Sequence, residues 1–107
     1  MKCLWTKRAV REYQKVLTYV YQEFGEKAAF DFIDNVDYWD GRIAQYPEIG
    51  APEKLLAGRK KHVYHSLIVS KHNKVIYTID ANGIVTILDL WDMRRHPDYL
   101  SGRIKTK

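Results

Sequence analysis

Side chains that can hold an anion or move a proton are concentrated in the second half of this chain. All four histidines lie there, and from residue 54 onward there are 11 basic and 4 acidic side chains, a net charge of +7. The first 53 residues carry 7 basic and 9 acidic side chains, a net charge of −2. A small domain with one strongly basic half usually binds an anionic partner, so this distribution points to nucleic acid or to an acidic protein.

The residue types in this half suggest phosphate chemistry. Lysine and arginine can hold a phosphate and stabilise the charge that builds on phosphorus when a 2′-hydroxyl cleaves RNA. Histidine can move protons near neutral pH. The candidate catalytic residues are His65, Lys74, Arg94, His96 and Tyr99. The candidate nucleic-acid-binding residues are Arg59, Lys60, Lys61, Lys74, Arg94 and Arg95.

These residues can act together only if the strands that carry them are neighbours. Antiparallel strands lie roughly 5 Å apart, so we expect His65, Lys74 and Arg94 to line one face of a sheet. Arg95, His96 and Tyr99 would then lie at its rim. The alternative is that these basic residues form only a solvated sheet face.

Other constellations favour structural roles. His62 and His65 are three residues apart in an expected strand, so their side chains should point to opposite faces of the sheet. We therefore expect no metal site. Nothing in the sequence implies a cofactor. There is no glycine-rich phosphate loop and no nucleophile elbow. Aspartates recur every third residue from Asp31 to Asp40, which predicts the solvated face of a helix. The single Cys3 cannot form an internal disulfide and is expected to be buried on the first strand.

The first half of the chain predicts a short strand followed by two helices. Residues 2–6 read as the strand, and Thr6 can cap the helix that follows. Apolar residues then recur at helical spacing as far as Phe24, and Gly25 ends that helix. A second amphipathic helix runs from Glu26 until Pro47. The short connection predicts an antiparallel helical hairpin.

After a loop from Pro47 to Gly58, the apolar period changes to two and predicts three strands. They cover residues 63–69, 75–79 and 84–91, and the last is so apolar that it should be central and covered. The expected order is β-α-α-β-β-β, a single α+β domain over residues 1–107 with a helical layer on an antiparallel sheet. The charged N-terminus and the lack of a long apolar run predict a cytoplasmic protein.

Several segments, taken in order, resemble the RelE/ParE superfamily of toxins from type II toxin–antitoxin modules. They are Ala28-Ala29-Phe30-Asp31-Phe32-Ile33, Tyr46-Pro47-Glu48-Ile49-Gly50, Gly58-Arg59, the strands from Tyr64 to Tyr77, and Asp92-Met93-Arg94-Arg95. The resemblance covers nearly the whole chain. It implies the α+β fold expected above and a cognate antitoxin as partner.

The superfamily contains two activities: RelE-like members cut mRNA in the ribosomal A site, and ParE-like members poison DNA gyrase. The resemblance places His65, Leu67 and Lys74 where RelE-like enzymes keep basic residues, and Arg94 at their last basic position. Leu67 lacks the expected charge, but other relatives cut mRNA with a histidine and a tyrosine near the C-terminus, roles that His96 and Tyr99 could fill. We therefore expect a ribosome-dependent mRNA endonuclease. The alternatives are a gyrase inhibitor and an inactive module that only binds its antitoxin.

Overall fold

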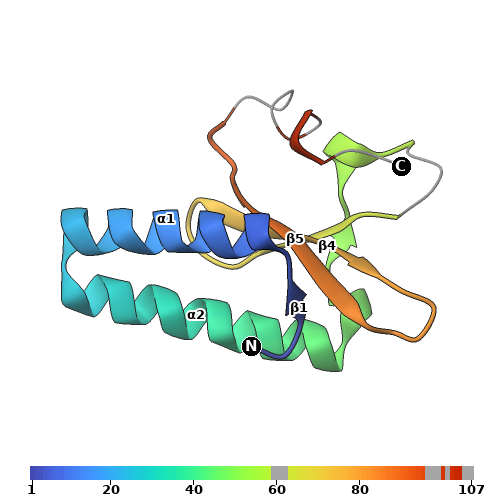
Figure 1. Cartoon of the computed structure of the whole chain (residues 1–107), viewed down its shortest axis with the longest axis horizontal. Helices are drawn as coiled ribbons and strands as arrows, with labels where there is room; N and C mark the ends of the chain where they lie inside the picture. The colour runs from blue at the N-terminus through green and yellow to red at the C-terminus, as the bar shows by residue number, and fades with distance from the viewer. Residues whose placement is uncertain (59–62, 96–99, 101, 105–107) are drawn as a thin grey trace.

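Two long antiparallel helices pack against one face of a five-stranded sheet (Figure 1). The computed structural model describes residues 1–58, 63–95, 100 and 102–104. Helix α1 spans Lys7–Phe24 and helix α2 spans Glu26–Gln45. The Thr6 hydroxyl accepts a hydrogen bond from the Ala9 N–H at 3.1 Å, which caps α1 as expected. Gly25, with φ 91°, allows the tight turn between the helices.

The sheet has the strand order β1-β5-β4-β3-β2. Its strands are β1 (Leu4–Trp5), β2 (Ala51–Pro52), β3 (His65–Ile68), β4 (Asn73–Ile79) and β5 (Val85–Asp92). The last three form the expected antiparallel meander. The sheet as a whole is mixed, because β1 pairs parallel with β5, and β2 is an additional short edge strand. The α+β fold is confirmed, and β5 lies inside the sheet between β1 and β4, although β4 is the middle strand.

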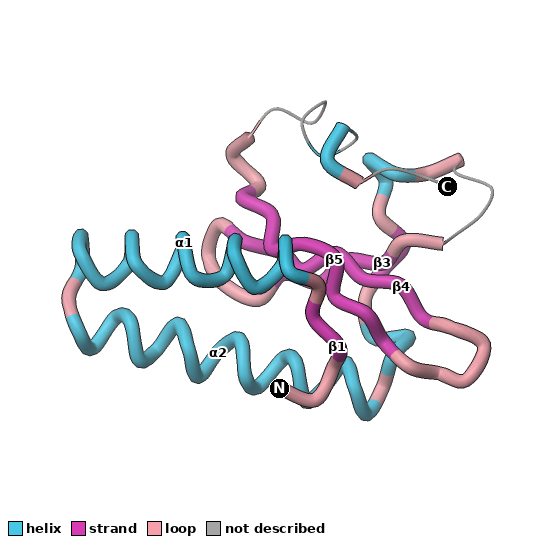
Figure 2. Tube along the Cα trace, in the orientation of Figure 1, coloured by secondary structure: helices cyan, strands magenta, loops and turns pink. Residues whose placement is uncertain are grey.

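Each face of the sheet carries a buried apolar cluster, and a different layer covers each cluster. The helices cover one face, where Phe32, Val36 and Ile43 of α2 pack against strand residues such as Val75 and Ile87. The opposite face carries a second apolar cluster, made of Leu56, Tyr64, Ile76, Trp91, Leu100 and Ile104. Figure 2 shows the described C-terminal turn beside the short 3-10 helix η2 (Lys54–Leu56), which contributes Leu56. The apolar character of β5 follows from this double coverage.

The aspartate series on α2 is only partly solvated. Asp31, Asp34 and Asp37 are exposed, as expected, but Asp40 is buried. Its carboxylate accepts hydrogen bonds from the Cys3 N–H at 3.2 Å and from the Trp5 indole N–H at 2.7 Å. The expectation of a fully solvated ridge is therefore wrong at Asp40, which fixes the N-terminal segment against α2. Cys3 is buried, directly before β1.

None of the described helices combines the length and the apolar character that crossing a membrane would require.

Candidate functional site

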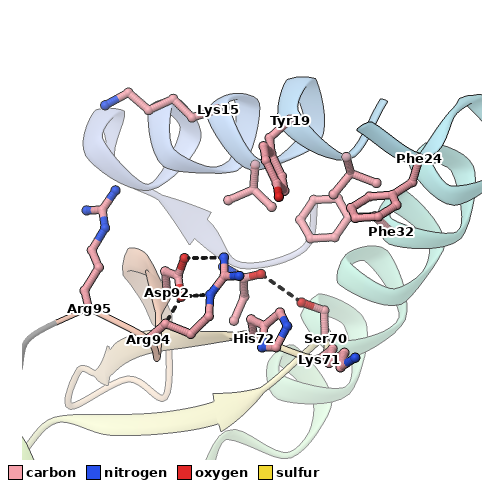
Figure 3. Close-up of a pocket in the computed structure, with 13 residues that line it drawn as sticks. Lys15, Tyr19, Phe24, Phe32, Ser70, Lys71, His72, Asp92, Arg94 and Arg95 are labelled. Carbon is pink, nitrogen blue, oxygen red and sulfur yellow. Dashed lines mark hydrogen bonds and ion pairs between the residues drawn. The ribbon is translucent and has the colours of Figure 1, made fainter. Parts of the chain in front are cut away.

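A groove with an apolar floor and a basic rim lies between α1 and the end of β5 (Figure 3). Its volume is about 590 Å³. The floor is formed by aliphatic and aromatic side chains of the two helices, namely Val16, Tyr19, Val20, Phe24 and Phe32. Tyr19 is 49% exposed and Phe24 is 67% exposed, so apolar surface is open to a ligand here.

Basic side chains from three segments surround this floor. Lys15 comes from α1, Lys71 and His72 come from the β3–β4 turn, and Arg94 and Arg95 follow β5. The end of β5 and the β3–β4 turn are held together because the Met93 N–H donates a hydrogen bond to the His72 carbonyl at 2.8 Å. The groove can therefore offer an apolar surface and several cations to one ligand.

Asp92 contributes a carboxylate to the same groove and holds Arg94. The Arg94 Nη2 lies 2.8 Å from Asp92 Oδ2, and the Arg94 Nε lies 3.0 Å from Oδ1. The backbone N–H of Arg94 also donates to Oδ1 at 2.9 Å, so Asp92 shapes the turn after the strand. Hydrogen bonds from the Arg94 guanidinium lower the pKa of Asp92 below its ordinary value. Arg94 remains 57% exposed, so a carboxylate or phosphate of a ligand can reach it.

His65 is part of the protein interior. It is 8% exposed, and its ring stacks on Tyr77 with ring centroids 5.3 Å apart. Its Nδ1 lies 3.3 Å from the Gly50 carbonyl oxygen. Both contacts are those of a packed histidine that supports the loop after α2.

Lys74 forms an ion pair with the buried carboxylate of Glu53. Burial alone would raise the pKa of Glu53, but hydrogen bonds from Lys74 and from the Leu55 N–H lower it below its ordinary value. The Lys74 side chain is 16% exposed. An internal carboxylate therefore already occupies the position at which Lys74 would hold a phosphate.

The expectation that His65, Lys74 and Arg94 line one sheet face is wrong. His65 pairs across the sheet with Tyr77, which lies three residues after Lys74 on β4. Side chains alternate along a strand, so His65 and Lys74 point to opposite faces. Arg94 lies beyond the end of β5, in the groove beside α1. The structure therefore brings Arg94 and Arg95 together at one site, with neither His65 nor Lys74.

The remaining sequence candidates fall in two groups. One group lies outside the described residues and consists of His96, Tyr99, Arg59, Lys60 and Lys61. Arg95 lies at the groove, with its guanidinium 5.8 Å from the centroid of the Trp91 ring and 3.9 Å from Glu12 Oε1.

Sequence reasoning missed the α1 side of this groove. Val16, Val20 and Phe24 lie at four-residue intervals on α1, and Lys15 and Tyr19 form a parallel line beside them. That pattern identifies a helix face with aromatic and basic members. The spacing does not indicate how much of this helix face stays exposed, because the exposed area depends on where the end of β5 lies.

Comparisons with known proteins agree with the fold. A family model described as the ParE toxin of the type II toxin–antitoxin system parDE matches residues 3–97. A solved structure titled "Chromosomal ParDE TA system from P. aeruginosa" superposes with a TM-score of 0.66 at 11% identity, covering 88% of this chain and 100% of that chain. No curated protein sequence matches this chain.

Proposed function

The chain belongs to the ParE toxin family of type II toxin–antitoxin systems, and from this membership we propose that it arrests growth by binding DNA gyrase. Its ParE-type match over residues 3–97 is the observation that carries the proposal. In this mechanism the toxin contributes a binding surface and no bond-breaking chemistry of its own. It would trap gyrase on cleaved DNA, and it would meet both gyrase and its antitoxin in the cytoplasm.

The arrangement of the basic residues supports protein binding over RNA cleavage. A ribonuclease needs its acid, base and phosphate-holding groups within hydrogen-bond reach of one scissile phosphate. Here His65 is packed on Tyr77, and Lys74 is neutralised by Glu53. Arg94 and Arg95 are the described candidates that stay open to a ligand, and an exposed arginine beside aromatic surface is a common anchor in protein interfaces.

The cognate antitoxin is the partner that we place in the groove. Antitoxin segments that fold on binding need an apolar surface to bury and charges that fix their position. The floor of the groove, which includes Val16 and Phe32, supplies the apolar surface. The positioning charges come from the rim, namely Lys15, Lys71, Arg94 and Arg95. We therefore expect an amphipathic acidic segment that covers Arg94 and so neutralises the toxin.

A growth assay combined with two biochemical assays tests this function. Induction of the toxin alone should stop growth, and co-expression of the antitoxin should restore it. The purified toxin should inhibit supercoiling by gyrase and accumulate cleaved gyrase–DNA complexes. Arg94→Glu should weaken both effects, and Asp31→Asn, on the exposed face of α2, should change neither.

The mRNA endonuclease remains the second candidate, because the exposed Arg94 could also hold a phosphate. It predicts mRNA cleaved within codons in a translating extract, with normal supercoiling. The gyrase proposal would be contradicted by mRNA cleavage with normal supercoiling, if this cleavage is lost in His65→Ala or Lys74→Ala. Induction without any growth defect would contradict both activities and favour a module that only binds its antitoxin.

A further inference from the structure

Three charged side chains from three parts of the chain meet behind the groove. Arg103, near the C-terminus, donates from Nη2 to Asp89 Oδ1 of β5 at 2.6 Å. The same Nη2 lies 3.2 Å from Glu12 Oε1 of α1. Glu12 is 7% exposed and Asp89 is fully buried. Two carboxylates therefore share one guanidinium in a desolvated position, where charge imbalance is costly.

Glu12 has additional cationic partners that belong to the groove. Its Oε2 lies 3.1 Å from Lys15 Nζ, and its Oε1 lies 3.9 Å from Arg95 Nη1. Lys15 and Arg95 both line the groove and are 64% and 46% exposed. Glu12 thus contacts both the open basic rim and Arg103, the partner of the buried Asp89.

The ion pair of Asp89 and Arg103 leaves two polar atoms without a hydrogen bond. Among the described residues, Asp89 Oδ2 and Arg103 Nε have no hydrogen-bond partner. Burial raises the pKa of Asp89 to about 6, and the charge of Glu12 contributes in the same direction, while Arg103 and Arg8 act against it. Within the part of the chain that the structure describes, the charged groups that act on Asp89 are Glu12 and Arg8 on α1 and Arg103 near the C-terminus. Asp89 can therefore change its charge near neutral pH, and the nearby charges determine where.

We propose that Glu12 couples occupancy of the groove to protonation of Asp89. An acidic partner in the groove draws Lys15 and Arg95 away from Glu12, which then takes a larger share of Arg103. The Asp89 carboxylate then loses part of its interaction with the positive charge of Arg103, and it binds a proton from solvent. By linkage, such a partner binds more tightly below the titration midpoint of Asp89 than above it. Its biological use rests on the proposed function, because it needs an acidic partner in the groove.

The coupling can be tested on the whole chain without any partner. Titration of the Asp89 carboxyl, followed by carbon-13 NMR, should give a midpoint of about 6 in the unmodified protein. Combining Lys15→Gln with Arg95→Gln imitates the loss of both groove cations from Glu12. This variant should raise the Asp89 midpoint by about half a pH unit or more.

Two further variants make the test specific. Lys71→Gln removes a groove cation that does not contact Glu12 and should leave the midpoint almost unchanged. Glu12→Gln removes the coupling charge and should lower the midpoint. An unchanged midpoint in the double variant, or an equal shift in Lys71→Gln, would overturn the coupling. Neither gyrase nor antitoxin is present, so this failure is distinct from a failure of the proposed function.

Discussion

The backbone N–H of Gly50 donates a hydrogen bond to the Tyr77 hydroxyl at 2.9 Å, inside the protein. The Tyr77 hydroxyl in turn donates to the Pro47 carbonyl at 2.6 Å. A Cβ atom on residue 50 would lie 2.6 Å from the Tyr77 hydroxyl oxygen and 2.7 Å from the Ser66 carbonyl oxygen. The loop after α2 is therefore held on the sheet by a contact that only glycine permits.

Gly50→Ala should destabilise the protein by about 1–3 kcal/mol, because the added methyl group must push apart packed atoms of β3 and β4. Gly41→Ala is the matched control, since Gly41 lies within α2 with nothing within 4 Å of its added Cβ. That variant should gain roughly 0.5–1 kcal/mol from helix propensity. Urea unfolding measures both changes, and equal midpoints for the two variants would contradict the packing argument.

The stability of the protein should depend on pH through Asp89. Its folded pKa of about 6 lies above the ordinary value of 3.8, so the folded state binds more protons between these values. The contribution of Asp89 to the free energy of unfolding therefore decreases as pH rises through this window, by about 1 kcal/mol from pH 5 to 7. Glu12 and Asp92 have lowered pKa values and act in the opposite direction at lower pH.

Asp89→Asn isolates this contribution, since asparagine can still accept a hydrogen bond from Arg103. The difference in unfolding free energy between the unmodified protein and the variant should change with pH between 5 and 7. Parallel curves for the two proteins over that range would show that Asp89 does not titrate there.

Buried Cys3 should be chemically inert. Burial and the neighbouring carboxylate of Asp40 raise the pKa of its thiol to about 12, so almost no thiolate is present at pH 8. The folded protein should react with a disulfide reagent at least about a hundredfold more slowly than the unfolded protein. Val63→Cys, at a 65% exposed position, provides a thiol that should react at once in the folded protein. Rapid labelling of Cys3 under native conditions would contradict its burial.

The main elements could be predicted from sequence because each depends on local pattern. The structure confirms the helical spacing up to Phe24 and the stop at Gly25. It also confirms the apolar strand expected over residues 84–91, which spans Val85–Asp92. The composition of β5 alone predicted a covered strand away from the sheet edge, and β5 lies between β1 and β4.

The site could not be predicted from sequence. It depends on how the strands pair with one another and on which segments cover each face of the sheet. Which face Lys74 occupies relative to His65 follows from their pairing partners, and no local pattern specifies these. The second sheet face is covered by Leu100 and Ile104, from a segment too short to show an amphipathic pattern. Glu53 also neutralises Lys74 from a distant part of the chain.

Asp92→Asn should strengthen binding of the antitoxin. In the free protein, the Asp92 carboxylate competes with a ligand for Arg94, because it holds both Nε and Nη2. Asparagine can still accept the backbone hydrogen bond that shapes this turn, so the turn should persist while the guanidinium becomes available. We expect affinity to rise roughly three- to tenfold at low salt, with less gain at high salt.

The control for this prediction is Asp31→Asn, which makes the same change of net charge on the exposed face of α2. Titration of each variant with purified antitoxin at two salt concentrations separates a specific effect at Arg94 from a general effect of net charge. An equal rise in antitoxin affinity in both variants would show that the rise comes from long-range electrostatic attraction alone. Weaker binding in Asp92→Asn would show that the antitoxin donates hydrogen bonds to Asp92, and the carboxylate would then be part of the binding surface.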